Sequence, residues 1–68
     1  MLTAFEKGKA YHFDIIEAIN NSADGEAPGW LVKNLIQYDG QLVRVINESV
    51  ANCDGVIIHP HWCKEVEL

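Results

Sequence analysis

The sequence predicts a mostly β fold, a single small antiparallel barrel that includes the whole chain, residues 1–68. A length of 68 residues with 49% hydrophobic content fits one small domain and leaves no room for a second. Runs rich in β-branched residues at 43–46 and 56–58 favour strands. The pair Asp39-Gly40 between two apolar runs is typical of a tight hairpin turn. The alternative is an α+β domain with a helix near 28–38.

The N-terminal segment 9–19 is expected to be mainly strand, because Tyr11, Phe13 and Ile15 alternate with other residues. A helical alternative exists, since Tyr11, Ile15 and Ile19 also recur at helical spacing. Asn, Ser, Asp, Gly and Pro cluster between Asn20 and Gly29. This cluster predicts a long surface loop.

The middle of the chain has two interpretations. In the first, 34–38 and 41–46 are two strands joined by a two-residue turn, because both residues of Asp39-Gly40 tolerate positive φ. In the second, Pro28 begins a helix that ends before Gly40. Its apolar face would hold Leu31, Val32, Leu35 and Ile36. The hairpin is favoured, since β-branched residues follow immediately.

The C-terminal part predicts three short elements. Residues 56–59 are a continuous β-branched strand between Gly55 and Pro60. Residues 60–64 begin with proline and fit a single 3₁₀ turn. Residues 65–68 alternate strictly and predict a final strand. The expected core consists of Tyr11, Phe13, Val43, Val45, Ile57, Val66 and Leu68.

This order of elements resembles SH3-like small barrels, in which a 3₁₀ turn joins the last two strands. The residues that carry the resemblance are 40–46 and 56–68, about the C-terminal 30 residues of the chain. The sequence lacks the Ala-Leu-Tyr-Asp-Tyr motif and the adjacent Trp-Trp pair of signalling SH3 domains, so binding of proline-rich peptides is not implied. Short acidic barrels also resemble accessory proteins of phages and mobile elements.

Charge restricts the class of partner. Ten acidic residues against five Lys and Arg give a formal net charge of −5. Direct binding of nucleic acid is not expected, because it requires Lys and Arg to neutralise phosphates. The stretch Asp14, Glu17, Asp24 and Glu26 is interpreted as a solvated face, with an acidic mimic of nucleic acid as an alternative. Without a signal segment or membrane helix, the expected location is the cytoplasm.

Two thiols and two imidazoles, the ligand types that zinc prefers, lie close together in sequence: Cys53, His59, His61 and Cys63. Pro60 and the predicted turn would disturb a ligand geometry, and the spacing lacks a C-x-x-C pair. No cofactor is therefore expected, and a zinc-stabilised domain remains the alternative. A Cys53–Cys63 disulfide would require an oxidising compartment.

Catalysis is not expected. The candidate groups are Cys63 as nucleophile, His59 or His61 as base and Asp54 to orient the base. Residues two apart on a tight turn rarely bring a thiol to an imidazole. So short a chain also has little volume for a pocket that excludes water.

The predicted function is a non-enzymatic interaction module. Trp30, Tyr38 and Trp62 occupy predicted loop or turn positions, where aromatic side chains can anchor a protein partner. Asp24 and Glu26 of the acidic loop complete the candidate contacts. The alternative is that the tryptophans close the two ends of a small core. The expected partner is a protein. Two specific forms of this hypothesis are a second copy of the chain and a host enzyme that the chain inhibits.

Overall fold

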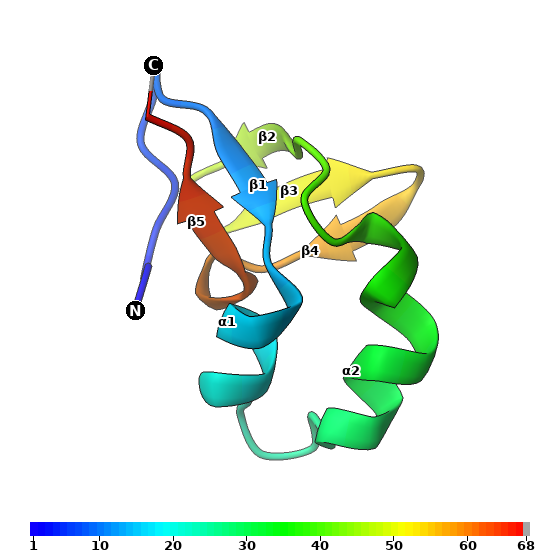
Figure 1. Ribbon diagram of the computed structural model, residues 1–68. Coiled ribbons are helices and arrows are strands. Elements are labelled where there is room, and N and C mark those ends of the chain that lie inside the picture. The colour runs from blue at the N-terminus through cyan, green and yellow to red at the C-terminus, as the bar shows by residue number, and fades with distance from the viewer. Residues whose placement is uncertain (68) are drawn as a thin grey trace.

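Two small antiparallel sheets and two helices make up the fold (Figure 1). A computed structural model describes residues 1–67. Along the chain the segments are β1 (Tyr11–Phe13), α1 (Ile15–Asn20), α2 (Pro28–Leu35), the 3₁₀ helix η1 (Ile36–Tyr38), β2 (Arg44–Asn47), β3 (Val50–Cys53), β4 (Val56–Ile58), the 3₁₀ helix η2 (Pro60–Trp62) and β5 (Cys63–Glu65). β1 pairs with β5, and β2, β3 and β4 form the second sheet in that order.

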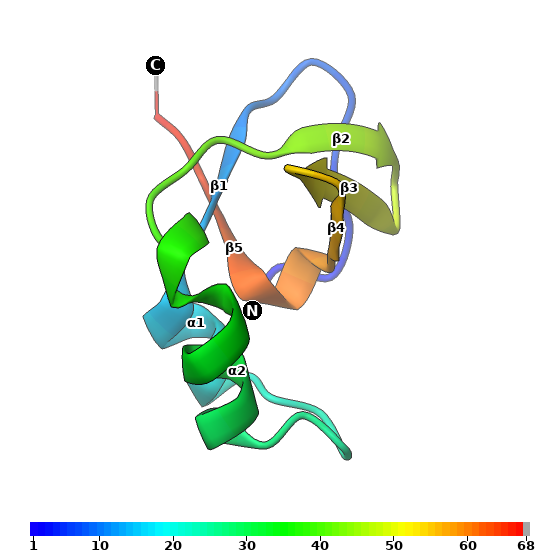
Figure 2. The same cartoon turned by 90° about the vertical axis from the view of Figure 1, so that its right-hand side faces the viewer.

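The two sheets do not close into a barrel. In the part of the chain that the structure describes, the two sheets are connected by an isolated β-bridge, which pairs His12 with Leu42. Backbone hydrogen bonds from Val43 N–H to the Tyr11 carbonyl oxygen (3.0 Å) and from Phe13 N–H to that of Gln41 (2.9 Å) extend this contact. The helices α1 and α2 pack together at one end of the molecule (Figure 2). The prediction of a mostly β barrel is therefore wrong as to closure, and the fold is mixed α+β.

The first strand is shorter than predicted because Asp14 begins a helix. Asp14 has an extended backbone (φ −132°, ψ 112°), and its side chain accepts a hydrogen bond from Glu17 N–H at 3.0 Å. This is the N-cap arrangement, which satisfies a free backbone donor in the first helical turn. The strand prediction holds for Tyr11–Phe13 and is wrong from Ile15 onward.

The helical alternative for the middle of the chain is confirmed, and the predicted hairpin around Asp39-Gly40 is wrong. Pro28 is at the start of α2, where its missing N–H costs nothing. Leu31 and Leu35 are buried one turn apart on the inner face of α2. Helix α2 takes up the end of the predicted 20–29 loop, which spans the shorter segment 21–27.

Asp39-Gly40 forms the turn from the helix to the sheet. Asp39 has φ −56° and ψ 126° and Gly40 has φ 82°, which fits a type II turn rather than the type I′ turn of a hairpin. The Asp39 side chain also accepts a hydrogen bond from Ile15 N–H at 2.9 Å. The type I′ conformation occurs instead at Asp54 (φ 52°) and Gly55 (φ 83°), between β3 and β4.

The C-terminal predictions are mostly confirmed. β4 and η2 occupy the predicted positions. The final strand, β5, is Cys63–Glu65 instead of 65–68. It begins earlier than predicted because Cys63 pairs with Phe13 of β1. The predicted position of Leu68 in the core lies outside the described residues.

The core lies between the sheets and the helices. It consists of Phe5, Tyr11, Phe13, Ile15, Ala18, Leu31, Leu35, Tyr38, Ala51, Cys53, Ile58, Trp62 and Cys63. Tyr11 and Phe13 are confirmed as core, whereas Val43 and Val66 are half-buried. Val45 and Ile57 are exposed, so their prediction is wrong. Within residues 1–67, no helix has the length and apolar character to cross a membrane.

Candidate functional site

The three aromatic candidates have different surroundings. The side chain of Trp30 on α2 is 53% exposed, whereas Tyr38 and Trp62 are buried. The Trp62 ring packs edge-on against Phe13 (6.2 Å between centroids) and against His59 (4.8 Å). Tyr38 and Trp62 are therefore part of the core and offer little surface to a partner. Trp30 is the aromatic candidate that faces solvent.

Glu26 is half-buried and connects the loop 21–27 to η2. Its carboxylate accepts hydrogen bonds from Trp62 Nε1 at 3.0 Å, His61 Nε2 at 2.9 Å and Ala23 N–H at 3.1 Å. Partial burial acts to raise the pKa of Glu26, but the hydrogen bonds from Trp62, His61 and Ala23 outweigh it and lower the pKa from 4.5 to about 2. Glu26 is thus a structural residue, and Asp24 is the exposed acid of this loop.

Two other carboxylates of the acidic stretch, those of Asp14 and Glu17, are also bound within the chain. Asp14 caps α1, as described above. Glu17 accepts a hydrogen bond from Asn21 Nδ2 at 2.9 Å and lies 3.6 Å from Lys64 Nζ. The stretch therefore does not form a row of free acids, which weakens the hypothesis that it mimics nucleic acid.

The predicted zinc ligands do not gather into a metal site. Within residues 1–67, no group of three or more His, Cys, Asp or Glu side chains is placed to hold a metal ion. The His59 and His61 rings stack with centroids 5.7 Å apart. At neutral pH, His61 Nε2 donates to Glu26, because an ionised carboxylate can only accept.

Both cysteines are buried free thiols. Cys63 Sγ donates to the His59 carbonyl oxygen at 3.6 Å, and Cys53 Sγ to Gln41 Oε1 at 3.4 Å. Burial, with a smaller contribution from Asp14 and Cys53, raises the pKa of Cys63 to about 12. Burial and the charge of Asp54 also raise the pKa of Cys53. These contacts do not place an imidazole nitrogen where it could activate either thiol.

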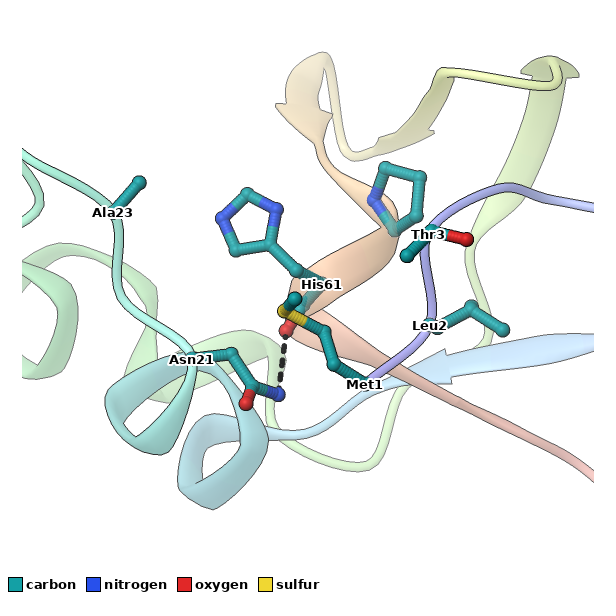
Figure 3. A pocket seen from close by; sticks show the side chains of 7 residues that line it. Met1, Leu2, Thr3, Asn21, Ala23 and His61 are labelled. Atoms are coloured by element: carbon teal, nitrogen blue, oxygen red, sulfur yellow. Dashed lines mark hydrogen bonds between the residues drawn. The ribbon is translucent and has the colours of Figure 1, made fainter.

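A shallow hollow of about 420 Å³ lies between the N-terminal segment and η2 (Figure 3). At one side of the hollow, Asn21 donates from Nδ2 to the His61 carbonyl oxygen at 3.3 Å. The hollow is lined by Met1, Leu2, Thr3, Asn21, Ala23, Pro60 and His61. Its one titratable side chain, His61, is already bound to Glu26, so the hollow offers little specific chemistry.

One face of the three-stranded sheet is apolar and exposed. Ala51 and Ile58 pair across β3 and β4 and are fully buried, so they mark the inner face. The neighbouring residues of these strands, Asn52 and Ile57, therefore point to the opposite side. Arg44 pairs with Asn52 and extends this row onto β2. The row therefore lies on the side of the sheet opposite the buried Ala51 and Ile58.

We call this surface the outer sheet face and define it by Leu42, Arg44, Ile46, Asn52 and Ile57. Its three apolar members are well exposed: Leu42 at 67%, Ile46 at 57% and Ile57 at 48%. The ladder shifts register between Val45 and Asn47, which makes Ile46 the extra residue of a β-bulge. A hollow of about 480 Å³ lies between Arg44, Val45, Ile46 and Asn52.

Sequence reasoning missed most of the outer sheet face. Arg44 lies between Val43 and Val45, an alternation that predicts a solvent-facing position in a strand, and its side chain is exposed. The sequence pattern predicts Ile57 in the core, and it does not distinguish Leu42, Ile46 or Asn52 from other residues. The available signal was the alternation of Ile57 with Ile58, since one of two adjacent strand residues must point away from the core.

Comparisons with known proteins do not assign the chain to a family. No family model, curated protein or solved structure matches it.

Proposed function

We propose that the protein is a non-enzymatic binding module that docks a protein partner on the outer sheet face. The observation that carries this proposal is the cross-strand row Arg44–Asn52–Ile57, which is flanked by the exposed side chains of Leu42 and Ile46. Apolar side chains close to an arginine are typical of the centre of protein interfaces, where Arg and large apolar groups are enriched and most other charges are depleted.

Helix α2 is a weaker candidate for the main contact. It exposes Trp30 (53%), Val32 (40%) and, just beyond its end, Ile36 (48%). At about 100° per residue, Val32 and Ile36 lie on one flank of the helix and Trp30 on the other, with Lys33 between them. These side chains do not form one continuous patch. We retain Trp30 and the exposed Asp24 as proposed peripheral contacts.

We also propose that the fold is a variant of the SH3-like arrangement. Support comes from the pairing of the first and last strands, the meander β2–β3–β4, and η2 between β4 and β5. In this proposal, α1, α2 and their loop occupy the connection between the first two strands. Fold likeness alone does not identify a function, so the binding proposal depends on the outer sheet face.

A capture experiment with matched variants tests the binding proposal. Tagged wild-type protein, Ile57→Glu and Trp30→Ser are each used to capture partners from the source cells, and the recovered partner is then tested for binding in purified form. Ile57→Glu places a charge on the outer sheet face, so we expect it to weaken binding by about tenfold or more. Trp30→Ser, on α2, should retain most of the binding. Loss with Trp30→Ser alone, or equal loss with both folded variants, would contradict the proposal.

A further inference from the structure

The hollow on the outer sheet face contains hydrogen-bond donors that have no partner in the part of the chain that the structure describes. Arg44 forms no ion pair with any of residues 1–67. Asn52 accepts a hydrogen bond from Gly55 N–H through Oδ1 at 2.9 Å, which fixes the orientation of the amide. Its Nδ2 group donates no hydrogen bond to residues 1–67 and remains available beside Arg44.

We propose that this hollow binds a carboxylate, supplied by an Asp or Glu side chain of the partner protein. The proposal rests on the proposed function and specifies the chemistry of the partner. A guanidinium presents paired N–H groups that match the two oxygens of a carboxylate. The Asn52 amide, opposite Arg44 on the neighbouring strand, adds a third donor from the side of the hollow.

The apolar surroundings determine what must flank the carboxylate. Leu42, Ile46 and Ile57 would exclude water from the ion pair only if the partner covered them with apolar side chains. The matching ligand is therefore an acidic residue between apolar residues, for example in an extended strand. Partial removal of water would make the ion pair stronger than a fully solvated surface pair.

A protein carboxylate fits better than a nucleic-acid phosphate. The chain has a net charge of −5, and Arg44 is the one basic residue on the outer sheet face. Lys9 is paired with Glu6 and Glu65, and Lys64 with Glu17. Stable binding to nucleic acid requires several phosphates to be neutralised at once, which one arginine cannot do.

The test uses NMR of the isotope-labelled full chain and two matched peptides, acetyl-Leu-Glu-Ile-amide and acetyl-Leu-Gln-Ile-amide. We expect the Glu peptide to shift the Arg44 Nε–H and Asn52 Nδ2 signals and to bind about threefold more tightly than the Gln peptide. Arg44→Gln should abolish this preference. Lys33→Gln, which removes an equal charge from α2, should preserve it.

Equal binding of the two peptides, or unchanged Arg44 and Asn52 signals, would overturn the carboxylate site. If both peptides shift Ile46 and Ile57 equally, the carboxylate site fails while the docking face stands. Shifts that follow the protein's own concentration would identify a second copy as the occupant and would also overturn the proposal. Failure of the capture experiment described above is a separate result, because it contradicts the docking face itself.

Discussion

Glu26 and Trp62 are hydrogen-bonded to each other across 36 positions of sequence, with 3.0 Å between the carboxylate oxygen and the indole Nε1. The bond connects the loop between α1 and α2 to the turn that leads into β5. It also satisfies the polar atom of a tryptophan whose ring is buried. An acidic residue in the loop 21–27 thus holds that loop against a tryptophan of the core.

Replacing Glu26 should destabilise the protein, whereas replacing its neighbour should not. Glu26→Gln removes the negative charge that accepts hydrogen bonds from Trp62 and His61, and we expect a loss of about 1–3 kcal/mol in the free energy of unfolding. Asp24→Asn makes the same change of charge at an exposed position. It should change the free energy of unfolding by less than about 0.5 kcal/mol. Urea denaturation at neutral pH measures both. Equal effects of the two variants would show that net charge matters and the hydrogen bonds do not.

The contribution of Glu26 should depend on pH. Its pKa is about 2 in the folded protein and 4.5 in its ordinary state. Because the folded pKa is the lower of the two, Glu26 stabilises the fold fully above about pH 4.5 and progressively less as the pH falls toward 2. The difference in unfolding free energy between wild type and Glu26→Gln should therefore shrink between about pH 6 and about pH 2.5. A difference that stays constant over this range would contradict the hydrogen-bonded carboxylate.

The two thiols should be unreactive in the folded protein. Burial raises the pKa of both, to about 12 for Cys63, and alkylation requires the thiolate. We expect iodoacetamide to modify the native protein at least about tenfold more slowly than the urea-unfolded protein at the same pH. Mass spectrometry counts the modified sites. Rapid native modification at Cys63 would mean that β5 opens or that its thiol is ionised.

Two glycines should respond to alanine in opposite directions. Gly55 has φ 83° in the hairpin turn, and Gly29 lies in the first turn of α2. A Cβ atom at either position would meet nothing within 4 Å, so backbone conformation decides the outcome. Gly55→Ala should cost about 1–2 kcal/mol, and Gly29→Ala should stabilise by up to about 1 kcal/mol. Thermal unfolding of both variants checks this, and stabilisation by Gly55→Ala would contradict the turn assignment.

The elements that could be predicted from the sequence are those determined by neighbouring residues. The strand at 56–58 and the 3₁₀ turn that follows depend on β-branched residues and on Pro60, which act locally. The sequence contains three Asp-Gly pairs, and local chemistry does not distinguish them. Asp39 forms a type II turn because the helix before it packs on the core and because its side chain binds Ile15 N–H, 24 positions away.

The surface could not be predicted for a related reason. Trp62 lies in a turn, where sequence patterns favour exposure, yet the distant Glu26 provides the hydrogen-bond partner that allows its burial. Ile57 and Ile58 are chemically identical neighbours, and only strand register decides which one is covered. Exposure of the outer sheet face therefore results from how the two sheets pack, which local periodicity does not specify.

The most direct test of the docking face is photo-cross-linking at single positions. A photoreactive phenylalanine derivative is placed at Ile57 on the outer sheet face or at Trp30 on α2, both of which are about half exposed. After irradiation in the source cells, we expect the protein labelled at Ile57 to form one discrete cross-linked product with a protein partner, which the Arg44→Gln substitution weakens. The protein labelled at Trp30, a proposed peripheral contact, should give less of this product. A product formed from Trp30 and not from Ile57 would contradict the outer sheet face as the site of binding.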